Sequence, residues 1–199
     1  MFVMMEENIK WYREKELDRL SSVLLDKGYL IYRVFSIEDA KKKILSLLSE
    51  DKTIALGDGW DLVDDEFINN LRKYKLFDRF NNINKLDENI KRESLLSNIA
   101  IVEGELITES GEVFVVGDYN TSLSLFGAEK LILLVSANKI VKDSKDGFSK
   151  IESMNKYYRM RSDRLNNVND GLSIGLIENG KKFPNRITVI ICDEDSGIY

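Results

Sequence analysis

Histidine is absent from the chain, and Cys192 is its single cysteine. Without an imidazole, Ser-His-Asp and Cys-His catalysis are excluded, so a general base would have to be a carboxylate, a lysine, a tyrosine or water. One cysteine closes no internal disulfide, and without a Cys-x-x-Cys pair we predict no metal site. Cys192 lies in the apolar run ITVIIC, where we expect it to be a small buried side chain.

The chain also lacks a long apolar run and a strongly basic segment. Its apolar runs fall well short of the roughly 20 residues that span a bilayer. The start, MFVMMEENIKW, lacks the apolar core and the cleavage site of a signal peptide. We therefore expect a cytoplasmic protein without a membrane partner. The formal net charge is -5 and the longest basic run is 41–43, which argues against nucleic acid as a partner.

The composition of the chain is typical of a globular domain, and the start of the chain shows the pattern of an additional helix. Of the 199 residues, 43% are hydrophobic and 32% are charged, which is typical of a single globular domain. Residues 5–27 carry apolar side chains at helical spacing, and Gly28 provides a helix stop. We expect an N-terminal helix, residues 1–27, packed on a domain formed by residues 28–199.

Beyond this helix, strand patterns alternate with helix patterns. Aromatic and branched residues predict strands, and helical periodicity separates several of them; the strands are expected at 29–35, 52–56, 112–117, 130–136 and 186–192, and the helices at 39–49, 62–74 and 144–161. Such alternation indicates βαβ units. The sequence therefore predicts the α/β class, with a mostly parallel sheet and helices on both of its faces.

The turn between the second strand and its helix is the first candidate for a binding element. Gly57, Asp58 and Gly59 form a glycine-rich connection there. Free N–H groups at the start of a helix favour a negatively charged ligand, so this turn could cradle an anion. The neighbouring aspartates would compete with such a ligand, and a tight turn followed by an aspartate N-cap is the alternative.

Two more candidates lie in the stretch 103–143, in which two apolar runs flank a polar segment. Ligands of open α/β sheets bind at the carboxyl ends of strands. Asn120 and Thr121 could donate hydrogen bonds to an oxyanion, or they could cap the short helix that follows. Lys139 comes after an apolar strand and could bind a carboxylate or a phosphate, with Asn138 orienting it. Alternatively, both are ordinary turn residues.

Six segments occur in the order of a known family between residues 24 and 199: LLDKGYLIYRVFSIEDAKKKIL, TIALGDGWDLVDDEFINNLRK, TESG, NTSLSLFGAEKLILLV, ANKIVKD and NRITVIICDEDSGIY. Together they resemble the LUD domain of the lactate-utilization proteins. The resemblance implies a three-layer α/β/α sandwich, similar to the sugar-phosphate isomerase and CoA-transferase superfamily. It also implies an accessory or regulatory protein of lactate utilization that binds a small organic acid or anion.

The resemblance identifies no cofactor. One branch of the family carries a cysteine-rich segment that suggests metal binding. The corresponding residues here, 162–185, contain no cysteine. A metal role is therefore not carried over.

The turn Thr108-Glu109-Ser110-Gly111 supports a second hypothesis. It resembles the Ser-Glu-Asn-Gly turn of one class of CoA-transferases, whose glutamate attacks an acyl-CoA. Glu109 would then be the catalytic nucleophile of a transferase or isomerase, with Ser110 and Gly111 beside a phosphorylated or CoA ligand. In the alternative interpretation, Glu109 only fixes the turn through hydrogen bonds with backbone N–H groups.

A third hypothesis is a non-catalytic interaction subunit. The N-terminal helix carries Trp11 and Tyr12 ahead of its regular apolar positions. These side chains offer an apolar anchor for self-association, which would make the protein a homo-oligomer.

Overall fold

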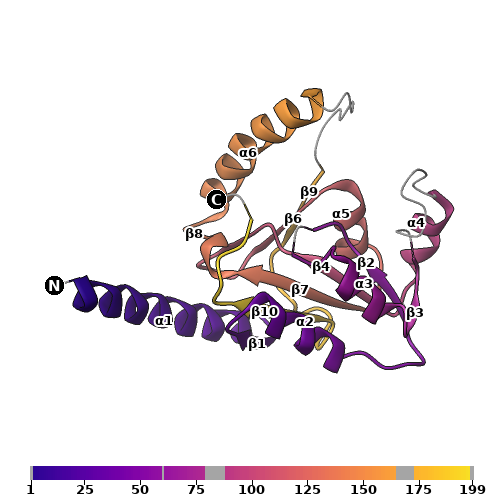
Figure 1. Cartoon of the computed structure of the whole chain (residues 1–199), viewed down its shortest axis with the longest axis horizontal. Helices are drawn as coiled ribbons and strands as arrows, with labels where there is room; N and C mark the ends of the chain where they lie inside the picture. Colours follow the sequence, from indigo (N-terminus) through magenta and orange to yellow (C-terminus); the bar gives the residue numbers. More distant parts are fainter. Residues whose placement is uncertain (1, 60, 79–87, 165–172, 198–199) are drawn as a thin grey trace.

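The computed structural model describes residues 2–59, 61–78, 88–164 and 173–197, and a parallel six-stranded sheet lies at its centre (Figure 1). The strand order is β1-β10-β7-β4-β2-β3, and every pairing is parallel. The strands are β1 (Leu30–Val34), β2 (Thr53–Leu56), β3 (Lys75–Leu76), β4 (Ile99–Glu103), β7 (Lys130–Ser136) and β10 (Ile187–Cys192). Because all are parallel, their carboxyl ends meet along one edge of the sheet.

Two helices cover one face of this sheet, α2 (Ile37–Ser46) and α3 (Asp65–Leu71). Both begin at a side-chain cap, because Ser36 Oγ accepts a hydrogen bond from the backbone N–H of Asp39, and Asp64 Oδ1 accepts one from that of Phe67. The side chains that pack between these helices and the sheet include Ile44, Phe67, Leu71, Ile101, Leu134 and Ile190.

The other face packs against α1 (Phe2–Asp26), α5 (Asp118–Leu125) and a second, four-stranded sheet. The second sheet has the order β8-β5-β6-β9. Its strands are β5 (Leu106–Thr108), β6 (Val113–Val116), β8 (Ile140–Val141) and β9 (Ile174–Ile177). The sequence pattern did not predict this sheet, and β6 pairs antiparallel with both β5 and β9.

Gly104 is the point where the chain passes from one sheet to the other. Its N–H donates to Leu134 O in the first sheet, whereas the N–H of Glu105 donates to Phe114 O in the second. A Cβ atom at Gly104 would lie 2.6 Å from Val135 Cγ2, so a glycine is needed at this crossing. In the sequence, the short connection Glu103-Gly104-Glu105 does not show that the two strands lie in different sheets.

The outer side of the second sheet is covered by α6 (Ser144–Arg164), and α4 (Glu88–Ser94) lies at the end of the molecule opposite the projecting α1 (Figure 1). Phe148 of α6 meets Phe114 edge to face, with 5.1 Å between the ring centroids. This arrangement confirms the predicted α/β sandwich with helices on both faces of a mostly parallel sheet. Among the residues that the structure describes, no helix combines the length and the apolar character that a bilayer span requires.

The N-terminal helix α1 has two different halves. Leu17, Leu20 and Leu24 are buried in the main core. The first half extends away from the body of the molecule (Figure 1), and none of the side chains from residue 8 to residue 16 is buried. The helix ends at Asp26, and the predicted stop, Gly28, follows two residues later with a φ of 84°, in the left-handed region that glycine adopts freely.

Candidate functional site

A buried ion pair lies where β4 and β7 end. Lys139, in the short turn after β7, places Nζ 3.8 Å from Oε2 of Glu103, the last residue of β4. The two side chains are only 4% and 7% exposed. Lys139 was expected at a site, but Glu103 was not. The signal that could have found it is a charged residue that ends the buried strand IAIVE.

Glu103 also holds the loop after β2. Its Oε1 atom accepts hydrogen bonds from the backbone N–H groups of Asp61, at 2.7 Å, and Leu62, at 2.9 Å. Burial raises the pKa of Glu103 above its usual value, and the charge of Asp61 adds to this rise, while Lys139 and the two backbone N–H groups counteract it. The loop lies so close that a Cβ atom at Gly59 would come within 2.2 Å of Oε1.

Asn120 holds the same loop from the opposite side. Its Oδ1 accepts from the backbone N–H of Asp58 at 2.7 Å, and its Nδ2 donates to Asp58 O at 2.8 Å and to Val116 O at 3.1 Å. A Cβ atom at Gly57 would lie 2.5 Å from Oδ1, so the contact requires a glycine there. The three predicted residues of the glycine turn are thus fixed between Glu103 and Asn120.

The predicted capping role of Asn120 and Thr121 is wrong. The helix α5 begins at Asp118, and its N-cap is Gly117, which has no side chain to accept the capping hydrogen bond. Asn120 and Thr121 therefore lie within the first turn of the helix. Thr121 faces β9, with Oγ1 3.5 Å from Ser173 O and 3.4 Å from Val115 O, so it lies away from the ion pair.

Removing the side chain of Asn120 should destabilise the protein. In Asn120→Ala, both polar backbone groups of Asp58 lose their partner, which costs about 1–3 kcal/mol of the free energy of unfolding. Asn120→Asp should cost more, because a carboxylate oxygen would face the carbonyl oxygens of Asp58 and Val116. Urea unfolding measures both losses. Thr121→Val is the control, with a change of less than about 1 kcal/mol; an equal loss in all three variants would contradict this role of Asn120.

Asp61 completes the polar cluster. Its Oδ2 atom is buried and has no hydrogen-bond partner in the part of the chain that the structure describes. Cys192, at the end of β10, is nearby, and burial together with the surrounding carboxylates raises the pKa of its thiol to about 11. At neutral pH Cys192 is therefore a buried thiol, as predicted. No group of three or more histidine, cysteine or acidic residues that could hold a metal ion occurs among the described residues.

Asn138 contacts the C-terminal segment. Its side chain donates to Ser196 O at 3.0 Å and accepts from the N–H of Ser196 at 3.1 Å, while Ser196 Oγ donates to Ser136 Oγ at 2.6 Å. The amide of Asn138 therefore positions the chain after β10 beside the ion pair. Lys139 itself pairs with Glu103.

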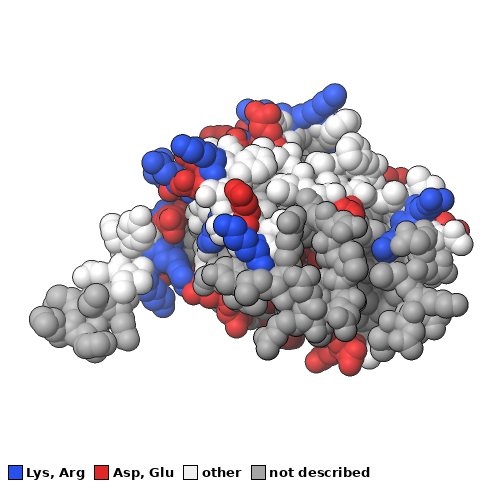
Figure 2. Space-filling view, turned by 90° about the horizontal axis from the view of Figure 1, so that it is seen from above, with Lys and Arg blue, Asp and Glu red and all other residues white. Residues whose placement is uncertain are grey.

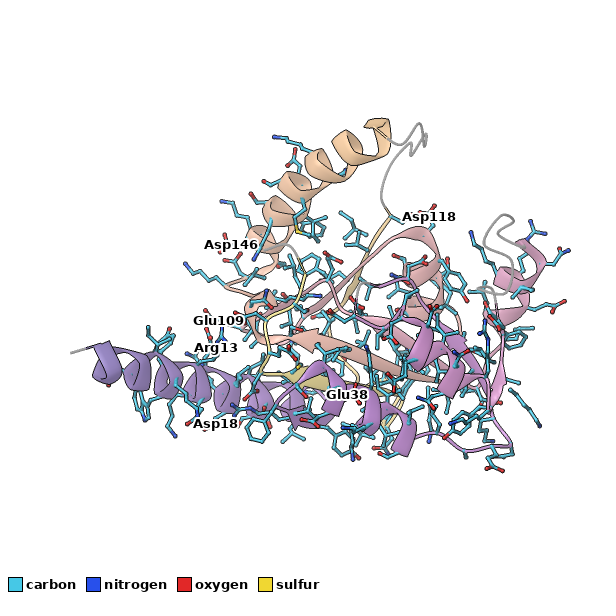
Figure 3. All side chains as sticks on the ribbon, viewed as in Figure 1. Arg13, Asp18, Glu38, Glu109, Asp118 and Asp146 are labelled. Atoms are coloured by element: carbon cyan, nitrogen blue, oxygen red, sulfur yellow. The ribbon has the colours of Figure 1, made fainter. Side chains whose placement is uncertain are left out.

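Glu109 lies in the turn between β5 and β6, next to α1. It is exposed, its N–H donates to Val141 O, and it borders a groove of about 190 Å³ that α1 helps to form. Gly111, with a φ of 83°, lets the turn approach Val23 and Leu24 of that helix. Ser110 is exposed, and its Oγ lies 3.0 Å from Thr108 Oγ1. Figure 3 shows Glu109 on the same side of α1 as Arg13, with Asp18 on the opposite side.

The matching family agrees with this architecture. The family model described as LUD domain matches residues 17–192. The chain belongs to the LUD domain family. A comparison with curated proteins gave no match.

A solved structure supports the fold of this LUD domain. It is the crystal structure of a DUF162 family protein from Deinococcus radiodurans, with a TM-score of 0.57 and 14% sequence identity. The alignment covers 91% of this chain and 98% of the other. At this identity the similarity concerns the fold alone.

Proposed function

We propose that this LUD-domain protein binds a small hydroxy acid at the carboxyl ends of β2, β4 and β7, as an accessory or regulatory protein of lactate utilization. Two polar groups that both adjoin Glu103 carry the proposal: the buried ammonium of Lys139, and a buried carboxylate oxygen of Asp61 that has no hydrogen-bond partner among the described residues. Lys139, with a side chain only 4% exposed, supplies the positive charge. Asp61 Oδ2 supplies the acceptor.

These two groups match the two polar groups of a hydroxy acid. The carboxylate of the ligand would accept a hydrogen bond from the ammonium of Lys139, which also forms the ion pair with Glu103. Burial strengthens this attraction, because the local dielectric is low. The hydroxyl group would donate to Asp61 Oδ2 and relieve the cost of an unpaired buried acceptor. A simple carboxylic acid lacks this second interaction.

Lactate should therefore raise the melting temperature more than propionate, which has no hydroxyl group, and more than pyruvate, whose carbonyl oxygen only accepts. A ligand that binds the native state alone stabilises it by mass action. The hydroxyl contact is worth about 1 kcal/mol, or roughly fivefold in Kd. Thermal shift ranks the acids, and calorimetric titration measures each Kd.

Two variants assign the parts of the ligand to side chains. Asp61→Ala should remove the preference for lactate over propionate, because it removes the carboxylate that accepts from the hydroxyl group. The loop should stay in place, because the backbone N–H of residue 61 still donates to Glu103. The double variant Lys139→Met/Glu103→Gln removes the ammonium without leaving the carboxylate of Glu103 unpaired, so it should keep the fold and lose both acids. Equal Kd values for lactate and propionate in the native protein would contradict the hydroxyl contact, and full lactate binding by the double variant would contradict the role of Lys139.

The alternative is a transferase or isomerase that uses Glu109. Its chemistry would take place in the groove beside α1, where Lys15 and Arg19 are the cations available to a phosphorylated or CoA ligand. Glu109→Gln should leave lactate binding unchanged if the acid binds at Lys139. If Glu109 is the nucleophile, the same variant should bind acyl-CoA without turning it over.

A further inference from the structure

We propose that α1 pairs antiparallel with α1 of a second copy of this chain, with Lys15 and Glu16 at the centre of the interface. The helix has 25 residues and is roughly 37 Å long, but only its second half packs on the core. The first half projects from the molecule with large apolar side chains in water: Ile9 is 59% exposed, Trp11 60% and Tyr12 65%. An isolated helical segment of this length is marginal in water without packing.

The projecting half is also distinct from the domain of the family. The LUD match starts at residue 17, so residues 2–16 lie outside it. Among the helix side chains whose burial the structure describes, from residue 8 onwards, Leu17 is the first that is buried. Residues 8–16 thus contribute exposed apolar surface and no buried side chain, which is the property of an interaction element rather than of a fold element.

One face of α1 is self-complementary in charge. Tyr12, Lys15, Glu16 and Arg19 follow each other at spacings of three and four residues, so they share a face, and all four line the groove beside the β5–β6 turn. When a second α1 lies antiparallel on this face, centred between residues 15 and 16, Lys15 of each copy meets Glu16 of the other. Arg19 of each copy meets the ring of Tyr12 of the other, where a cation–π contact forms.

The groove, of about 190 Å³, lies beneath the path of the second helix and can receive side chains from it. Its apolar members are Leu20 and Ile140. In the antiparallel arrangement the N-terminal half of the second α1 runs along these residues, so its exposed apolar side chains leave the water. Basic and acidic side chains lie side by side where α1 leaves the body (Figure 2), so the surface repels neither sign of charge. A two-fold arrangement of this kind uses the same patch on both copies and closes as a dimer.

Charge reversal in two separate variants tests the pairing. Lys15→Glu and Glu16→Lys each place like charges at both central contacts, so each should weaken dimerisation roughly tenfold or more. An equimolar mixture of the two variants should associate as the wild type does, because every central pair is again opposite in charge. Sedimentation equilibrium should give twice the chain mass of 22.9 kDa for the wild type and for the mixture, and a lower mass for each variant alone.

Three controls make the result specific. Lys10→Glu changes an exposed residue on the opposite side of the helix and should leave the mass unchanged. Asp18→Asn removes the partner of Lys15 within the same helix, 3.5 Å away, and should not weaken the dimer. Circular dichroism of each variant confirms that the helix remains. A monomeric wild type, a dimer that neither reversal weakens, or a mixture that stays dissociated would each overturn the proposal.

Discussion

Replacing Lys139 with methionine should lower the free energy of unfolding by about 3–5 kcal/mol, because the carboxylate of Glu103 would remain buried without its cation. Methionine keeps the apolar part and the approximate volume of the lysine side chain, so the loss measures the charge rather than the packing. With side chains 4% and 7% exposed, water cannot replace the missing partner. Urea unfolding at neutral pH measures the loss.

The pH dependence of this loss separates charge from packing. Burial raises the pKa of Glu103, so the folded protein keeps this proton to a higher pH than the unfolded chain. The contribution of Glu103 protonation to stability is therefore complete below its usual pKa of 4.5 and is lost as the pH rises through the folded value. Without the counteracting charge of Lys139 the pKa rises further, so Lys139→Met should approach the stability of the wild type as the pH falls.

A matched variant checks the assignment. Lys139→Met/Glu103→Gln carries no charge in the pair, so its stability relative to the wild type should vary much less with pH than that of the single variant. It should also recover most of the loss, since a neutral pair of similar volume often replaces a buried ion pair at little cost. A difference between Lys139→Met and the wild type that stays constant from pH 4 to pH 8 would show that Glu103 is not the affected group.

The first sheet was predictable because its strands carry their own signal. The runs around β7 and β10 are continuously apolar, as expected for strands buried on both faces, and the caps at Ser36 and Asp64 are local motifs. The second sheet was not predictable for the opposite reason. Its strand β5 follows β4 after only Gly104 and Glu105, and the change of sheet depends on the close packing of Gly104 against Val135, which no local pattern indicates.

The candidate site was predictable in part. Lys139 and the turn from Gly57 to Gly59 follow strands of a parallel sheet, so their position at its carboxyl edge follows from topology alone. Their partners depend on contacts across the fold: Asn120 reaches the turn from α5, and Glu103 reaches it from β4. The sequence marks Glu103 only as a charged residue at the end of an apolar strand, and it holds no signal for the groups that Glu103 or Asn120 contacts across the fold.

Gly59→Ala should destabilise the protein by about 2–4 kcal/mol, although it adds only one methyl group. The new Cβ atom would lie 2.2 Å from Glu103 Oε1 and 2.4 Å from its Cδ, far inside van der Waals contact. Either the loop or the carboxylate must move, and both movements break the hydrogen bonds from the N–H groups of Asp61 and Leu62. Chemical denaturation measures the loss.

Shortening the carboxylate should relieve this clash. Glu103→Asp alone costs stability, because the carboxylate withdraws from the loop and from Lys139. The double variant Gly59→Ala/Glu103→Asp should lose about 1 kcal/mol or more less stability than the sum of the two single-variant losses, because the shorter carboxylate makes room for the new methyl group. Gly175→Ala is the control. The atom nearest to its new Cβ would be Cδ1 of the flexible Leu125 side chain, at 3.0 Å. The stability lost in Gly175→Ala should simply add to that lost in Glu103→Asp.

The same variant connects stability to ligand binding. A loop displaced by Gly59→Ala carries Asp61 away from Lys139, so the affinity for lactate should fall towards that for propionate while Lys139 still holds the carboxylate. Glu103→Asp in the same chain should restore part of the preference. If Gly59→Ala kept the full preference for the hydroxy acid despite its lower stability, the hydroxyl group would have to be recognised elsewhere than at Asp61.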